Sequence, residues 1–228
     1  AADLAMTRRD YDSALSNYKL VHNDYKSQNA WKALACTYEA MAHAHLLSKA
    51  PSSSHLKSDI DQAYENALST LAKYEASGSG DLHKQVCLML KTRAAVGHAQ
   101  ALSAIGAHRD ANLPLVRASA MDDSDIRAAL LLERAAFSFI QCTPPMHRKF
   151  ASYMILAGAR YVRAGAIAGA TRCYAYALPI MKGKSWGAAE EHLHSTLGRL
   201  MSRAGEKKTA MEFFRDAVRC EHLPKDAQ

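Results

Sequence analysis

Apolar residues recur along most of this chain at the three- and four-residue spacing of an amphipathic helix. Between turn signals, no segment of four or more residues alternates apolar and polar positions as a half-buried strand does. The pattern predicts an all-α fold of about eleven helices without a sheet. Among them we expect helices over residues 10–26, 30–50, 59–75, 82–105 and 126–141.

Turn-forming residues separate these segments. Ser77 to Gly80 predict a flexible loop near residues 76–81, and Asp122-Asp123-Ser124 supply N-cap chemistry for the helix that follows. The first nine residues read as the end of a helix, with no initiator Met and no apolar signal core. We therefore expect a piece of a longer polypeptide, with residues 1–228 forming a single domain.

Two stretches about forty residues apart carry the same kinds of residue in the same order, and a fixed period of this size is typical of stacked helix pairs. The offsets match those of tetratricopeptide (TPR) repeats. The pattern predicts an α-solenoid of antiparallel TPR-like helix pairs, clearest over residues 147–182 and 185–222. The matching residues are Gly158, Gly165, Ala170, Tyr174 and Ala177, echoed by Gly198, Gly205, Ala210, Phe214 and Ala217.

Each of these positions has a physical role in a helix pair. A glycine at 158 or 198 lets the second helix lie close to the first, and Tyr174 or Phe214 fills the groove between them. Gly165 opens the turn between the two helices, as its counterpart does in the second repeat. Solenoids of this kind mostly present surfaces to partners, so the repeat predicts an interaction scaffold.

The composition is that of a folded, helix-rich protein, with 49% hydrophobic residues and only 6 prolines. No run of about eighteen apolar residues predicts a membrane span. The 5 cysteines are scattered and form no Cys-x-x-Cys pair. Reduced thiols, mostly buried on apolar helix faces, are therefore expected in place of a disulfide framework.

The net charge of +7 is concentrated in one part of the chain, because no Asp or Glu occurs between Glu133 and Glu190. These basic residues either decorate a solvated helix face or dock an acidic partner subunit or an anionic membrane. Nucleic acid is not expected as a partner, because the tyrosines of this window lie on apolar stripes. The candidate docking residues are Arg148, Lys149, Arg160, Arg163, Arg172, Lys182 and Lys184.

Motifs for chemistry are incomplete. Gly183-Lys184-Ser185 resembles the end of a phosphate-binding loop, but Leu178 stands where that motif needs its first glycine. Glu191 and His194 form a single Glu-x-x-His, with Glu190 four residues before the histidine, whereas a di-iron bundle needs two such motifs. No group of residues orients a nucleophile or a base. We therefore expect no catalytic residue, no metal site and no cofactor.

Longer stretches resemble one family. They are the segment from Asp125 to Glu133, the segment from Pro145 to Gly158, Arg172-Cys173-Tyr174, and the segment from Met181 to His192. Together these resemble the helical C-terminal half of the large subunit specific to TRAPP III, the third transport protein particle complex. A departure from this pattern is Pro179, which should shorten or kink the second helix of its pair.

The resemblance implies a non-catalytic scaffold in a vesicle-tethering complex that activates a Rab GTPase for endoplasmic reticulum (ER)–Golgi traffic and autophagy. It implies that the partners are other TRAPP subunits, with the Rab GTPase contacted indirectly, and that the location is cytoplasmic, peripheral to Golgi or pre-autophagosomal membranes. The alternatives are a helical enzyme and an independent TPR adaptor that binds a peptide or an acidic partner. Against a peptide-carboxylate clamp, Ile155, Ala159, Ser195 and Arg199 occupy the positions where Lys and Asn would be needed.

Overall fold

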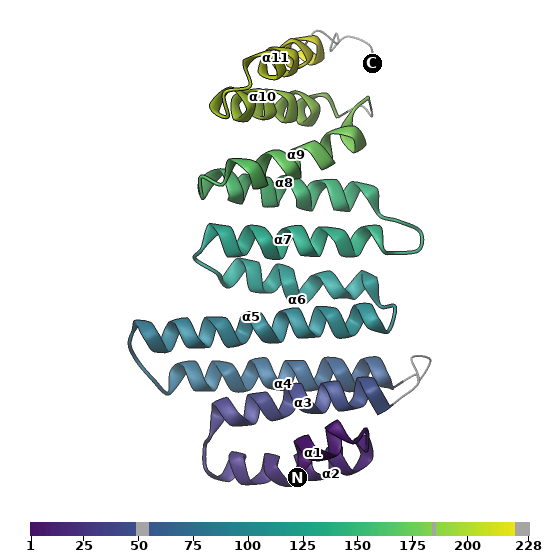
Figure 1. The fold of residues 1–228 in the computed structure, drawn as a ribbon, viewed down its shortest axis with the longest axis vertical. Helices are drawn as coiled ribbons and strands as arrows, with labels where there is room; N and C mark the ends of the chain where they lie inside the picture. The colour runs from purple at the N-terminus through teal and green to yellow at the C-terminus, as the bar shows by residue number, and fades with distance from the viewer. Residues whose placement is uncertain (49–54, 184–185, 222–228) are drawn as a thin grey trace. The chain divides into compact units, whose positions relative to one another are not determined.

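The computed structural model describes residues 1–48, 55–183 and 186–221, and these contain helices and no strands, which confirms the all-α prediction (Figure 1). The helices are α1 (Ala2–Thr7), α2 (Tyr11–Ser27), α3 (Trp31–Ser48), α4 (Leu56–Ala76), α5 (Asp81–Ala104), α6 (His108–Met121), α7 (Asp125–Ile140), α8 (His147–Arg163), α9 (Ile167–Met181), α10 (Gly187–Arg203) and α11 (Lys207–Glu221).

The contacts divide the chain into two compact units, Ala1–Ala118 and Ser119–Gln228, with the boundary inside α6. In unit 1, helices α1 to α5 pack in chain order, each antiparallel to the one before it (Figure 1). Its main apolar core forms around α4, where Leu56, Ile60, Tyr64 and Leu71 are each at most 1% exposed. The expectation of a single domain over residues 1–228 stays a prediction.

Unit 2 consists of the antiparallel helices α7 to α11, each packed against its neighbour in the chain (Figure 1). Met154 of α8, Tyr174 of α9 and Leu193 and Leu197 of α10 are almost fully buried between them. Both units are thus stacks of antiparallel TPR-like helix pairs, the architecture expected from the forty-residue period.

Small residues set how closely the paired helices approach in unit 2. A Cβ atom added at Gly158 would lie 2.9 Å from the ring of Tyr174, and one added at Gly198 would lie 2.8 Å from the ring of Phe214. Both contacts are shorter than van der Waals packing allows, so each glycine admits an aromatic ring of the next helix directly against its backbone. The two rings differ in burial, because Tyr174 is 2% exposed and Phe214 is 39% exposed.

One turn geometry joins five of the helix pairs. A residue with positive φ ends the first helix, and the amide that follows it donates a hydrogen bond to the carbonyl five residues earlier, as in a Schellman turn. Gly165 and Gly205 hold this position with φ of 74° and 88°. The same position is held by Arg9, Asn29 and Gly106 in unit 1.

Pro179 lies in the last turn of α9, which continues to Met181. A proline cannot donate its backbone nitrogen to the helix, but this one is exposed and only two residues from the helix end. The helix therefore ends close behind the proline, and α10 still packs against α9.

Candidate docking surface

The stretch between Glu133 and Glu190 contains no acidic residue of its own. Carboxylates of α7 neutralise part of its positive charge. Asp125, at the start of α7, accepts a hydrogen bond from Arg160 Nη1 at 2.9 Å, and Arg163 Nη2 lies 3.1 Å from the same oxygen. Both arginines are in the last turn of α8, which runs antiparallel to α7 and so returns to the start of that helix. Two of the seven candidate docking residues therefore contribute to the packing of α7 against α8.

Glu133 has the same role for a third arginine. Its carboxylate accepts hydrogen bonds from the hydroxyl of Tyr161 on α8, at 2.8 Å, and from the Nε and Nη2 atoms of Arg172 on α9, at 3.0 and 2.8 Å. The Glu133 side chain is only 12% exposed. Burial and the adjacent carboxylate raise the pKa of the Tyr161 hydroxyl, which stays protonated and continues to donate. One carboxylate thus connects three successive helices.

Three of the remaining candidates, Arg148, Lys149 and Lys182, are exposed and have no carboxylate partner among the described residues. The Arg148 guanidinium lies 5.8 Å from the ring centre of Trp186, and the Lys149 ammonium lies 5.5 Å from that of Phe139. Each has the geometry of a weak cation–π contact, which leaves the charge in water. Lys182 is exposed just after α9, whereas Lys184 lies outside the described residues.

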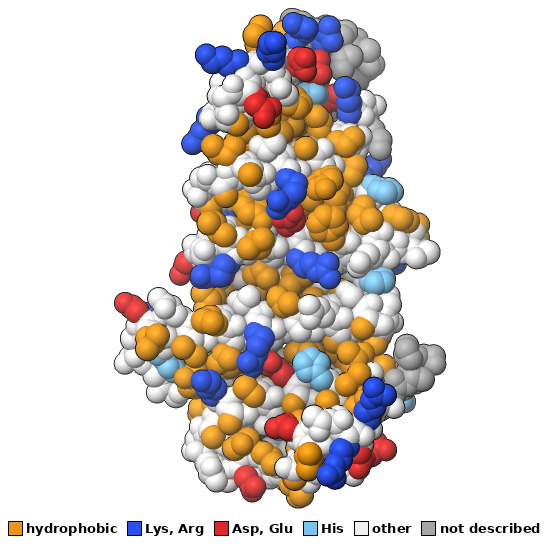
Figure 2. All heavy atoms as spheres, in the orientation of Figure 1, with side chains coloured by type: hydrophobic (Ala, Val, Ile, Leu, Met, Phe, Trp, Pro, Cys, Tyr) orange, Lys and Arg blue, Asp and Glu red, His pale blue; other side chains and the backbone are white. Residues whose placement is uncertain are grey.

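Figure 2 shows how the cationic side chains of unit 2 are distributed on the visible face. Lys and Arg are scattered among apolar side chains and do not join into one continuous patch. A dispersed set of charges beside apolar surface is better suited to a specific protein contact than to unspecific attraction by a uniform field. The docking role of these residues stays a prediction.

A groove of about 320 Å³ lies between α8 and α10 in unit 2. Its wall is apolar, formed by Ala159 and Val162 of α8, Tyr174 of α9 and Leu200 of α10. Ala159 and Arg199, two of the positions compared with a carboxylate clamp, line this groove. The groove therefore lies on the face where the repeat pattern places the inner sides of first helices.

Two arginines and a histidine of α10 line the same groove. His192, Arg199 and Arg203 fall at helical spacing and are all exposed. Arg199 donates a hydrogen bond to the hydroxyl of Thr196 at 3.2 Å, and neither arginine has a carboxylate partner among the described residues. Sequence reasoning missed Arg203 and His192, although their spacing from Arg199 along one helix was available as a signal.

Near the start of α10, the Glu-x-x-His region has a third possible metal ligand, which comes from another helix and so does not appear in the local spacing. Glu190 and His194 lie beside Cys220 of α11, with their ligand atoms within 4.8 Å of one another. Glu191 of the motif is not part of this group. The five cysteines are all free thiols, and Cys87, Cys142 and Cys173 are buried.

None of the helices in the described ranges is both long and apolar enough to cross a bilayer. Stacked antiparallel TPR-like helix pairs define the class of this chain as a helical-repeat protein.

The family described as "ER-Golgi trafficking TRAPP I complex 85 kDa subunit" matches residues 1–106. Human trafficking protein particle complex subunit 8 is 32% identical over 217 residues, which cover 94% of this chain. The chain belongs to this family of TRAPP subunits, as its sequence resemblance indicated. It spans 14% of the length of the human relative.

Two solved structures are similar to this chain. BtubC (BKLC) from P. vanneervenii has a TM-score of 0.37 and 14% identity, covering 100% of this chain and 96% of its own. MamA has a TM-score of 0.35 and 17% identity, with coverage of 97% and 94%.

Proposed function

We propose that this chain is a non-catalytic scaffold segment of a TRAPP-type vesicle-tethering and Rab guanine-nucleotide-exchange complex. It acts in ER–Golgi transport and autophagy, is cytoplasmic, and associates peripherally with Golgi or pre-autophagosomal membranes. A Rab GTPase is reached only through the complex. The observation that carries the proposal is the 32% identity to a TRAPP subunit over 94% of the chain, which includes both units.

The mechanism is geometric. Stacked helix pairs hold their exposed faces at fixed separations, because each pair is packed against the next by buried side chains. In unit 2, the contacts of Glu133 with Tyr161 and Arg172 add directional bonds to this packing. Other TRAPP subunits that dock on such a unit are held at a defined distance from the exchange catalyst.

The docking residues we propose are those basic residues whose charge is not used inside the unit, namely Arg148, Lys149 and Lys182. Arg160, Arg163 and Arg172 belong to the broader candidate set but also join α7 to α8 and α9. Charge reversal at these three would break internal ion pairs, and a loss of binding there could arise from altered packing. The complementary partner surface is acidic.

The test is co-purification of the other TRAPP subunits with the tagged full-length protein. We expect R148E/K149E/K182E to weaken recovery of at least one subunit at least about fivefold, with unchanged thermal stability, because rim charges mainly govern association. The matched control is K207E/K208E, which changes two exposed charges at the start of α11. If the triple variant recovers as much of every subunit as wild type does, the proposed docking residues are wrong. If no TRAPP subunit co-purifies with the wild-type protein, the scaffold role is wrong.

A liposome arm separates a membrane from a protein partner. Wild-type protein is mixed with vesicles of phosphatidylcholine alone and with vesicles that also contain about 30% phosphatidylserine, an anionic lipid that attracts basic protein surfaces. We expect no sedimentation with either. Binding to the anionic vesicles that R148E/K149E/K182E abolishes assigns these residues to a membrane surface.

The second candidate function is an independent adaptor that binds a peptide or an acidic partner, and the groove between α8 and α10 favours it. An occupant that fits has apolar side chains for the wall formed by Val162 and Leu200, and acidic residues for Arg199 and Arg203. R199E/R203E should abolish binding of such a segment while TRAPP subunits still co-purify. If the variant also loses TRAPP subunits, the groove belongs to the scaffold function.

A further inference from the structure

The His194 imidazole is the one deeply buried ring in the α10–α11 pair without a hydrogen bond among the described residues. The side chain is 2% exposed and its Nδ1 atom has no partner. Its Nε2 atom lies 3.9 Å from Glu190 Oε1, which is too far for a hydrogen bond. The Nε2 atom therefore faces the Glu190 carboxylate at a distance that leaves room for an ion between them.

Two further donors lie at the same place. Glu190 is one helical turn before His194 on α10, with a side chain 14% exposed, and Cys220 comes from α11 and is half-buried. The three ligand atoms lie within 4.8 Å of one another. An (i, i+4) pair on one helix with a third ligand from a neighbouring element is a spacing that tetrahedral metal sites use.

The carboxylate is already oriented by its surroundings. Glu190 Oε2 accepts a hydrogen bond from the backbone amide of Gly183 at 2.9 Å, so its Oε1 atom remains directed toward His194. Carboxylates that bind metals are held by outer hydrogen bonds of this kind. The bond comes from the Gly183 amide, just after α9, and it holds the carboxylate beside the Cys220 thiol, which also hydrogen-bonds to Glu190.

The charges around the group favour a cation. Glu190, Asp216 and Glu191 all lie close enough to act electrostatically on Cys220, and Lys182 is the positive charge that acts on His194. A thiolate, a carboxylate and a neutral imidazole together carry two negative charges, which balance a divalent ion.

We propose that Glu190, His194 and Cys220 bind one zinc ion that links α10 to α11. Mixed nitrogen, sulfur and oxygen donors match zinc better than magnesium or calcium, which prefer oxygen alone. Binding displaces the proton of the Cys220 thiol, which passes to solvent as the sulfur–zinc bond forms. The partly exposed thiol provides the path of entry, and a water molecule completes the fourth position.

The first experiment uses the purified 228-residue chain with cobalt as a spectroscopic probe and zinc in competition. We expect one equivalent of Co²⁺ to produce a thiolate-to-cobalt charge-transfer band that one equivalent of Zn²⁺ removes. C220S should lose the band, and E190Q should weaken binding by about 10–100-fold or more, the loss seen even for outer partners of metal ligands. A substitution of the buried His194 could unfold the chain, so the test uses the Glu190 and Cys220 variants instead.

Matched controls come from the chain itself. E191Q/H192N changes the adjacent carboxylate and imidazole, and C36S removes the other half-buried thiol. Both should keep the band and the one-to-one stoichiometry. Zinc should also raise the thermal midpoint of wild type and of both controls but not of C220S.

Two results would overturn the proposal. One is the absence of a cobalt band or of zinc-dependent stabilisation in wild type, in which case the imidazole is hydrated and no metal is held. The other is metal binding that survives C220S, which would place the ion elsewhere in the chain.

Discussion

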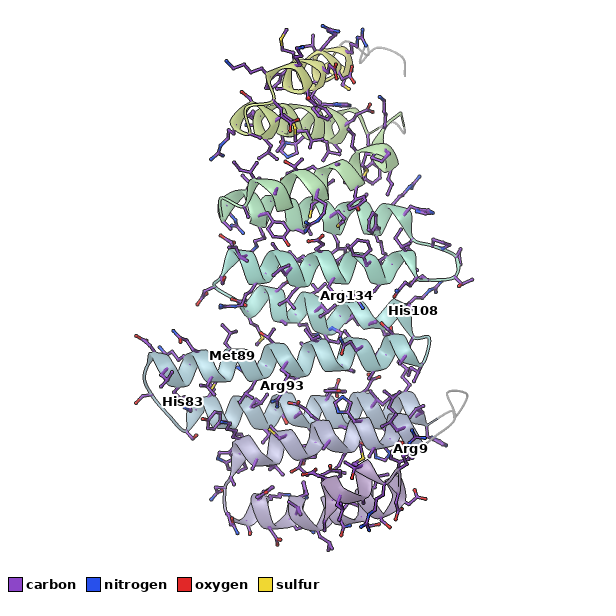
Figure 3. All side chains as sticks on the ribbon, in the orientation of Figure 1. Arg9, His83, Met89, Arg93, His108 and Arg134 are labelled. Carbon is purple, nitrogen blue, oxygen red and sulfur yellow. The ribbon has the colours of Figure 1, made fainter. Side chains whose placement is uncertain are left out.

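The Arg93 guanidinium on α5 donates two hydrogen bonds to the Glu39 carboxylate on α3, with its Nε and Nη2 atoms each 3.0 Å from a different oxygen (Arg93 is labelled in Figure 3). These residues are separated by 54 positions in the chain. The Glu39 side chain is 11% exposed, so its charge is compensated mainly by this arginine. Burial of a carboxylate is costly without such a partner.

We expect R93A to lower the free energy of unfolding of unit 1 by about 1–3 kcal/mol, because Glu39 is left with an uncompensated charge. R93K should fall in between, since an ammonium keeps the charge but loses the two-pronged geometry. Chemical denaturation followed by circular dichroism measures both. If R93A, E39Q and the double variant R93A/E39Q lose the same free energy of unfolding, Arg93 and Glu39 stabilise the protein as a pair. A loss in the double variant equal to the sum of the two single losses would contradict this.

The two repeat glycines should differ in their tolerance of a methyl group. G158A places a Cβ atom against the buried ring of Tyr174, which cannot move away, so overpacking outweighs the helix propensity gained. We expect a net loss of about 1–2 kcal/mol of stability. G198A meets the half-exposed ring of Phe214, which can rotate into solvent, and should change stability by less than about 0.5 kcal/mol. Equal stability changes in G158A and G198A, measured by chemical denaturation, would show that burial of the aromatic ring does not determine the cost of the added methyl group.

Arg9 occupies a left-handed turn that suits glycine. Its φ is 62°, and Asp10 closes the turn with a hydrogen bond to Ala5 (Arg9 is labelled in Figure 3). An L-residue in this conformation costs about 1–2 kcal/mol, so R9G should stabilise the chain by about 0.5–1 kcal/mol after the entropy of glycine is deducted. G165A, with φ of 74°, is the reverse change and should destabilise by about 1 kcal/mol. Thermal midpoints compare the two, and a destabilised R9G would contradict the assignment of strain.

Asp122 should make stability depend on pH at the acidic end. Burial alone would raise the pKa of its carboxyl, but hydrogen bonds from Arg127 and from the Ser124 amide hold it below its usual value of 3.8. A lowered folded-state pKa contributes stability above the unfolded pKa and loses it as pH falls through the folded pKa. The gap between wild type and D122N, about 1–3 kcal/mol at neutral pH, should therefore narrow below about pH 4.

Denaturant titrations of both proteins from pH 7 to pH 3 measure that gap. R127K serves as the control, because it keeps a positive charge beside Asp122 and should show the same direction of change. A gap that stays constant down to pH 3 would mean that the Asp122 carboxylate is not stabilised in the folded state.

The helices could be predicted closely. The segments expected over residues 82–105 and 126–141 are Asp81–Ala104 and Asp125–Ile140 in the structure. The recurrence of small and aromatic residues likewise predicted where Tyr174 would meet Gly158. These features follow from spacing within one or two helices. Arg9 escaped the same reasoning, because an arginine carries no signal for a left-handed turn that glycine usually occupies.

The amino-acid sequence by itself determined the helices, their glycine turns, the repeat and the family, because each depends on residues that are near one another in the chain. Only the tertiary structure decided which charged side chains form ion pairs and which possible metal ligands lie side by side. Arg172 hydrogen-bonds to Glu133, 39 positions earlier in the chain, and Cys220 of α11 lies beside His194 of α10. Such pairs depend on how one helix is registered against the next, and that register is set by packing along whole helices.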